Sequence, residues 1–196
     1  MADYAIDDTY TVTETEVAGI VRTLCISYSS IRRSFLAKYS EIHNSLEKGD
    51  TTETARLMGS VFNLPSNFLK KVGYSATIEE VASVQLSFKG PEGLNGTPFE
   101  CILLFRNSKS SLCKKSQPFI LHAIAHELSH ARLILDRHTL RHSEFATDVL
   151  AVIATGTPER YFGSVVKPGH RCGYIRPELY KVLFVNLLKH VSTIYL

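Results

Sequence analysis

The chain has 196 residues, of which 44% are hydrophobic, so it is long enough to bury one substantial core and fits one domain better than two. Its 22 Lys and Arg residues against 19 Asp and Glu give a net charge of +3, which is too small to indicate a nucleic-acid partner. Four scattered cysteines without CxxC spacing fit neither a zinc ribbon nor a disulfide framework. We predict a single domain over residues 1–196 without a nucleic-acid partner, and the sequence predicts no particular oligomeric state.

The N-terminal segment lacks the basic start of a secretory signal, because no Lys or Arg precedes Arg22. No uninterrupted apolar run reaches the roughly 18 residues that a membrane-spanning helix needs. We therefore expect a cytoplasmic protein without a membrane span. Signal-independent secretion as an effector is the alternative for its location.

The N-terminal part, residues 1–75, is predicted to be helical. Residues 13–50 carry apolar side chains at helical intervals, which predicts one long helix or two in tandem. The segment TTETARLMGSVFNLP follows Asp50, has Glu53 in its first turn and stops near Pro65. These start and stop signals predict a further, shorter helix.

The middle of the chain, residues 80–160, begins with a change of period. The segments VASVQLSFKG (81–90) and FECILLFRN (99–107) place apolar residues at every second position, which predicts two strands. The intervening GPEGLNGTP is rich in Gly and Pro, as a loop between antiparallel strands should be. We predict a small, largely antiparallel sheet.

The next helix is predicted to begin near Ser116 or Pro118 and to end before the polar segment RHTLRHS. Apolar residues cover nearly its whole circumference, which indicates a helix buried at the centre of the fold. Yet it contains HAIAHELSHA (122–131), with three histidines and a glutamate. Burying such groups without partners costs on the order of several kcal/mol each, so they are either hydrogen-bonded within the core or bind a metal.

Two of these histidines, His126 and His130, lie four residues apart, one above the other on one helical face, so their imidazoles can share one ion. Glu127 lies about 100° round the helix from His126, close enough to act on a water bound to that ion. This His-Glu-x-x-His pattern resembles the active-site helix of the zincin metallopeptidases. The resemblance implies one zinc ion as cofactor, Glu127 as the catalytic base and a protein or peptide substrate. It also implies that strand 99–107 binds an extended peptide along its edge, and an ordinary sheet strand is the alternative.

A catalytic zinc site needs a third protein ligand and keeps a fourth position for water. Glu144 and Asp148 form an E-x-x-x-D pattern on the next predicted helix. This pattern resembles the third-ligand helix of the glutamate-liganded zincins, the gluzincin branch that includes thermolysin. The resemblance implies that Glu144 binds the zinc and that Asp148 supports His126 from behind.

Other third ligands stay open at this point. Asp136 occupies the last position of the extended metzincin pattern, although Leu133 stands where that pattern has a glycine to turn the chain. His138 and His142 could reach the metal if their loop folded back. His122, one turn before His126, is expected to pack near the site.

The donor that stabilises the oxyanion of the reaction is not specified by spacing. The downstream segment YFGSVVKPGHRCGYIRPELY contains four candidates, Tyr161, His170, Arg171 and Tyr174. Beyond it, residues 177–196 begin with Pro177 and Glu178 and continue with apolar residues, which predicts a C-terminal helix.

Together these features predict an α+β, mostly helical, zincin-like domain that acts as a zinc-dependent endopeptidase on a restricted set of protein substrates. A small zincin without a signal peptide also resembles the intracellular ImmA/IrrE group of peptidases, although no helix-turn-helix or partner-binding module is attached. The alternatives are a zincin-derived zinc module that binds a partner without hydrolysis, and a zinc hydrolase of non-peptide amides.

Overall fold

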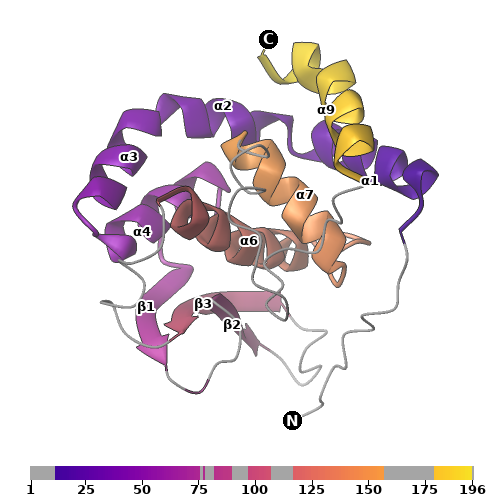
Figure 1. Ribbon diagram of the computed structural model, residues 1–196. Helices are drawn as coiled ribbons and strands as arrows, with labels where there is room; N and C mark the ends of the chain where they lie inside the picture. Colours follow the sequence, from indigo (N-terminus) through magenta and orange to yellow (C-terminus); the bar gives the residue numbers. More distant parts are fainter. Residues whose placement is uncertain are drawn as a thin grey trace.

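The computed structural model of the protein describes residues 12–75, 77, 82–89, 97–106, 117–156 and 179–195. Within these ranges the fold is α+β and mostly helical, as predicted (Figure 1). None of the described helices combines the length and apolar character needed to cross a membrane. In chain order the elements are α1 (Glu14–Ser27), α2 (Ser29–Ala37), α3 (Tyr39–Glu47), α4 (Thr51–Val61), β1 (Leu69–Ser75), β2 (Ala82–Lys89), β3 (Thr97–Arg106), α6 (Gln117–Leu135), α7 (Glu144–Thr155) and α9 (Tyr180–Tyr195).

The predicted helical segment 13–50 forms three helices, not one or two. Helix α1 begins with a capping box, in which Thr13 and Glu16 satisfy each other's backbone N–H groups. The chain leaves helical geometry at Tyr28 and Lys38, and neither break contains Gly or Pro. Helices α1, α2 and α3 instead follow an arc around α6 and α7 (Figure 1), so packing against these helices decides where the breaks fall.

Helix α4 begins where the sequence predicts, because the Asp50 carboxylate caps it by accepting the Glu53 N–H at 2.9 Å.

The sheet has the strand order β1-β3-β2. Strands β2 and β3 pair antiparallel as predicted, with Val84 opposite Leu103. Strand β1 is parallel to β3, so the prediction of a largely antiparallel sheet is wrong and the sheet is mixed. The residues of β1 also fall inside the part predicted to be helical. A register irregularity between Leu69 and Lys71 interrupts the alternation of apolar residues, which explains why the sequence hides this strand.

Strand β3 lies in the middle of the described sheet, with a partner on each side. A strand paired on both sides has no backbone groups left for a further strand, so the prediction that segment 99–107 binds a peptide along its edge is wrong. Strands β1 and β2 are the outer strands of the described sheet.

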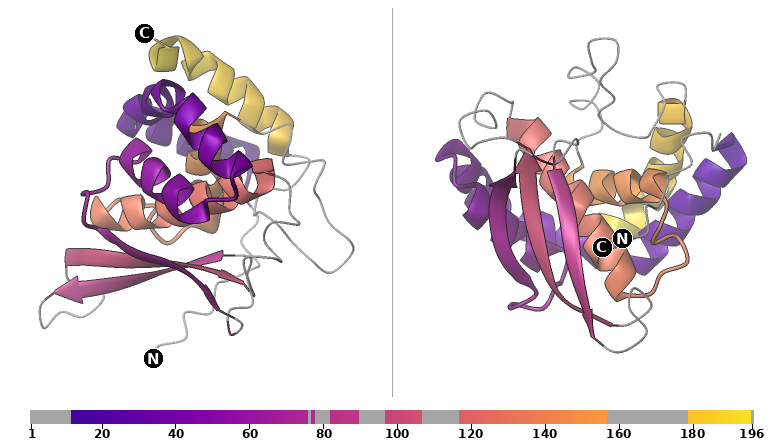
Figure 2. Two further views of the ribbon diagram at one scale, coloured as in Figure 1. Left: turned by 90° about the vertical axis from the view of Figure 1, so that its left-hand side faces the viewer. Right: turned by 90° about the horizontal axis from the view of Figure 1, so that it is seen from below.

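All the described helices lie on one side of the sheet, with α6 close to it and α9 farthest away (Figures 1 and 2). Alternate residues of β3, namely Cys101, Leu103 and Phe105, are fully buried. Every residue of α7 from Phe145 to Thr155 is buried. Helices α6 and α7 therefore form the interior of the molecule, and any polar group on their shared face must find its partner there.

Truncating a core residue of α6 should destabilise the protein strongly. Ile124 is 0% exposed, and Ile124→Ala is expected to lower the free energy of unfolding by about 2–5 kcal/mol, since it leaves a cavity. The matched control is Ile26→Ala in α1, where the side chain is 65% exposed and the change should stay within about 0.5 kcal/mol. Urea unfolding followed by circular dichroism measures both, and equal losses would contradict this description of the core.

Candidate metal centre

Three histidines on one face of α6 meet three polar side chains of α7. They are spaced by four residues, which brings them to one face of the helix. His122, at the start of this stripe of histidines, contacts Asp148, and His130, at the end of the stripe, contacts Glu144 in the first turn of α7. The two helices therefore run antiparallel. The six residues are His122, His126 and His130 on α6, and Glu144, Thr147 and Asp148 on α7.

The end of α6 determines which acidic residues can reach this face. The helix continues past Leu133 to Leu135, because the glycine that would turn the chain earlier is absent. It closes with a Schellman motif, in which the His138 N–H donates to the Leu133 carbonyl at 2.9 Å and Arg137 adopts a left-handed φ of 52°.

Helix α7 begins with Ser143 as its N-cap, whose hydroxyl accepts the Ala146 N–H at 3.2 Å. Glu144 is consequently the first residue of α7. A carboxylate is favoured there by the partial positive charge of the helix N-terminus.

The side chains of His126, His130 and Glu144 place three ligand atoms close together. The two histidine Nε2 atoms lie 3.2 Å apart, and Oε2 of Glu144 lies 3.2 Å and 3.1 Å from them. Tetrahedral ligands at roughly 2.0–2.1 Å from a zinc ion lie about 3.3 Å from one another, so one ion fits among these atoms. The three side chains are 12%, 15% and 17% exposed, which leaves an approach for water or a substrate.

The charges of this cluster also suit a cation. Burial raises the pKa of Glu144, but the neighbouring His126 and His130 outweigh burial and hold this pKa at about 2. Burial lowers the pKa of His126, but the carboxylates of Asp148 and Glu144 outweigh it and raise this pKa well above 6.5. In the metal-free protein the excess negative charge is thus balanced by protons, which a divalent cation can replace.

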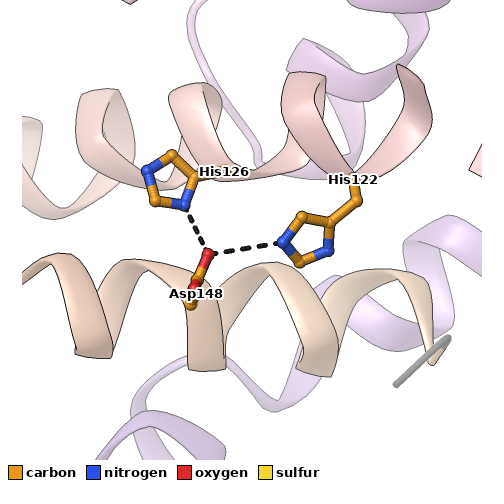
Figure 3. A group of neighbouring side chains, drawn as sticks. All are labelled: His122, His126 and Asp148. Atoms are coloured by element: carbon orange, nitrogen blue, oxygen red, sulfur yellow. Dashed lines mark hydrogen bonds and ion pairs between the residues drawn. The ribbon is translucent and has the colours of Figure 1, made fainter. Parts of the chain in front are cut away.

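Asp148 approaches His126 from the side opposite to Glu144. Its Oδ1 contacts Nδ1 of His126 (Figure 3) at a distance of 2.7 Å. The side chain of Asp148 is fully buried. Burial raises the pKa of Asp148, but His126 and His122 hold it well below its usual range, so the carboxylate is ionised and only accepts hydrogen bonds. In the neutral imidazole of His126, Nδ1–H therefore donates to Asp148, which leaves the Nε2 lone pair for a metal.

Thr147 supports His130 in a similar way, and the sequence does not predict it. Its Oγ1 lies 3.3 Å from Nδ1 of His130 and donates its own proton to the Ser143 carbonyl at 2.9 Å. The hydroxyl oxygen is therefore oriented to accept the Nδ1–H of His130. The available signal is its position three residues after Glu144 on the same helical face.

Glu127 lies on α6 beside His126, half-buried and facing strand β2. Burial raises its pKa, and the charge of Glu144 raises it further, although both histidines and a hydrogen bond from the Val84 N–H oppose the shift. The pKa remains above its usual value. A carboxylate of raised pKa beside these potential metal ligands can take a proton from a nearby water and return it.

The competing third ligands lie elsewhere. Asp136 accepts hydrogen bonds from the Tyr28 hydroxyl at 2.9 Å and from Arg132, which ties the break between α1 and α2 to the end of α6. The ring of His138 packs near that of Tyr28. Neither of the two potential metal clusters in the described part of the chain contains Asp136, His138 or His142. The candidate oxyanion donors Tyr161, His170, Arg171 and Tyr174 lie outside the described residues.

Comparison with protein-family models, with curated protein sequences and with solved structures finds no match to this chain. What the geometry of the described residues shows is a cluster of histidine, glutamate and aspartate side chains that could hold a metal ion.

Zinc binding to this cluster is predicted to strengthen with rising pH. Zinc takes a neutral imidazole, whereas the raised pKa of His126 keeps that ring protonated in the metal-free protein well above pH 6.5. The logarithm of the apparent association constant should rise by about one or more per pH unit between about pH 6.5 and about pH 8. Titration against a chromophoric chelator, corrected for protonation of that chelator, measures it.

Asp148→Asn provides the control for this pH dependence. It removes a charge that raises the pKa of His126, so the slope should flatten at the upper end of the range. A wild-type association constant that does not change with pH would contradict the prediction.

Proposed function

We propose that this protein is a zinc-dependent metalloendopeptidase that hydrolyses peptide bonds in a restricted set of protein substrates. One observation carries the proposal: the ligand atoms of His126, His130 and Glu144 lie 3.1–3.2 Å apart, and Glu127 follows the first of these ligands directly in the chain. This geometry supports the zincin resemblance of the sequence, because it joins the two motifs that carry the resemblance into one site.

Two imidazoles, one carboxylate and an open position favour zinc over magnesium or calcium, which prefer oxygen ligands. Zinc, when bound, polarises a substrate carbonyl and lowers the pKa of a bound water toward neutrality. The ligand Glu144 adds one negative charge to the site, and Asp148 and Thr147 hold the two imidazole rings with their Nε2 atoms toward the ion.

Glu127 is the proposed general base and acid. Its carboxylate accepts a proton from the attacking water as the water oxygen bonds to the carbonyl carbon of the peptide. It then passes this proton to the peptide nitrogen as the carbon–nitrogen bond breaks. The raised pKa of Glu127 suits both transfers, since the ideal pKa of such a group lies near the working pH.

Strand β2 is the proposed binding edge for the substrate, in place of β3. It is an outer strand of the described sheet, and the Val84 N–H reaches Glu127, so this edge faces the site. Backbone groups of a strand point to the same side at every second residue, so those of Ala82 and Leu86 lie along this edge too. An extended peptide paired with β2 would pass beside the cluster.

Glu127→Gln tests catalysis separately from metal binding. The amide cannot accept the proton, so kcat/KM for peptide hydrolysis should fall at least about 100-fold while the zinc content stays at the wild-type level. Each protein is incubated with a peptide library prepared from a cell lysate, and mass spectrometry identifies the newly formed termini. Glu41→Gln, the same change at an exposed position of α3, is the matched control and should cleave as the wild type does.

The outcomes separate the candidate functions. A wild-type protein that carries zinc but cleaves no peptide would contradict the peptidase and favour a zinc module that binds a partner. Turnover of small amides without any cleavage of peptides would favour a non-peptide amidase. Unchanged cleavage by Glu127→Gln would remove Glu127 from the mechanism.

A further inference from the structure

We infer that His122 is a positioning residue of the metal site, which acts by holding the carboxylate of Asp148 in the orientation that supports His126. Resting on the metal site of the proposed function, the inference adds a residue that neither motif of the sequence contains. Figure 3 shows the arrangement: the rings of His122 and His126, both from α6, point toward the same carboxylate of α7.

The contacts meet at a single atom. Oδ1 of Asp148 lies 2.7 Å from Nδ1 of His126 and 3.3 Å from Nε2 of His122. The side chains of His122 and Asp148 are 5% and 0% exposed. Because water has little access to this side of the cluster, the protein itself must supply the hydrogen bonds of the carboxylate.

The roles of donor and acceptor make the contact directional. A carboxylate oxygen accepts, so His122 donates its Nε2–H to the same oxygen that accepts the Nδ1–H of His126. Two donors from successive turns of one helix therefore aim at Oδ1 from different directions. This limits the rotation of the carboxylate and, through it, the direction in which the Nε2 lone pair of His126 points.

A second metal ion held by His122, His126 and Asp148 is the competing explanation, since their ligand atoms lie within 4.8 Å of one another. The shorter of the two distances to Asp148 favours hydrogen bonding. The separation of 2.7 Å between Asp148 and His126 is that of a charge-assisted hydrogen bond and is shorter than the spacing of about 3.3 Å between two ligands of one zinc ion. His126 also has its Nε2 in the cluster with Glu144, which does have the wider spacing.

The test compares zinc affinity across substitutions of His122, measured by competition with a chromophoric chelator. His122→Phe keeps a ring in the core but removes the donor, and should weaken zinc binding about tenfold, within the range for partners of metal ligands. His122→Gln places an amide N–H near the position of Nε2 and should restore most of the wild-type affinity. A merely structural role for the ring would predict the opposite order, because phenylalanine preserves its shape better than glutamine does.

A double-mutant cycle examines whether the effect passes through Asp148. In an Asp148→Ala background, His122→Phe should cause no further loss of zinc affinity, because the carboxylate that it positions is gone. Thermal unfolding of the metal-free proteins checks that each variant is folded. If His122→Phe does not fold, His122→Asn takes its place, since the shorter amide does not reach Asp148 in the manner of Nε2.

Wild-type zinc affinity in the folded donor-deleting variant would overturn the inference, as would an equal loss in the Asp148→Ala background. The proteolysis assay is independent of these measurements. If the wild type cleaves peptides but substitution of His122 does not change the zinc affinity, this inference alone is overturned. The expected order of zinc affinities without any proteolysis would support it and contradict the peptidase alone.

Discussion

The hydrogen bond between Asp148 and His126 is the interaction on which the rest of the site depends. The Asp148 carboxylate is completely buried between the two helices. Burying a charge costs several kcal/mol unless the charge is paired and hydrogen-bonded. The α6–α7 contact satisfies this demand by placing histidines opposite acceptors along one shared stripe. Loss of that register would leave Asp148 buried without its partners. The sheet below α6 and the helices around α7 supply the packing that keeps the two helices together.

The stripe has two ends with different properties. At the Asp148 end the groups are enclosed, and the separation of 2.7 Å between Asp148 and His126 is that of a charge-assisted hydrogen bond. At the Glu144 end the side chains reach the surface, and their three ligand atoms have the spacing of a metal site. His126 belongs to both ends, with Nδ1 in the first and Nε2 in the second. One ring therefore links the buried interior to a partly exposed cluster that could hold a metal ion.

Helical periodicity places residues four apart on one face, which relates His126 to His130 and Glu144 to Asp148. That the two pairs belong to one site is implied only by the resemblance to the glutamate-liganded zincins. Thr147 and the role of His122 depend on the register between α6 and α7, which periodicity does not define. The fold is less predictable where tertiary packing decides. Tyr28 and Lys38 end helices without Gly or Pro, and the irregularity after Leu69 conceals β1. Alternation predicts β3 as a strand but not its central position.

The most direct measurement is the zinc content of the purified protein by elemental analysis, with wild type and Glu144→Ala prepared in parallel and offered zinc. A site built from two histidines and Glu144 predicts about one zinc per wild-type chain and a sharply reduced content in the variant. No zinc in the wild type would return the histidines to a purely structural role. Undiminished zinc in folded Glu144→Ala would mean that another residue completes the metal centre.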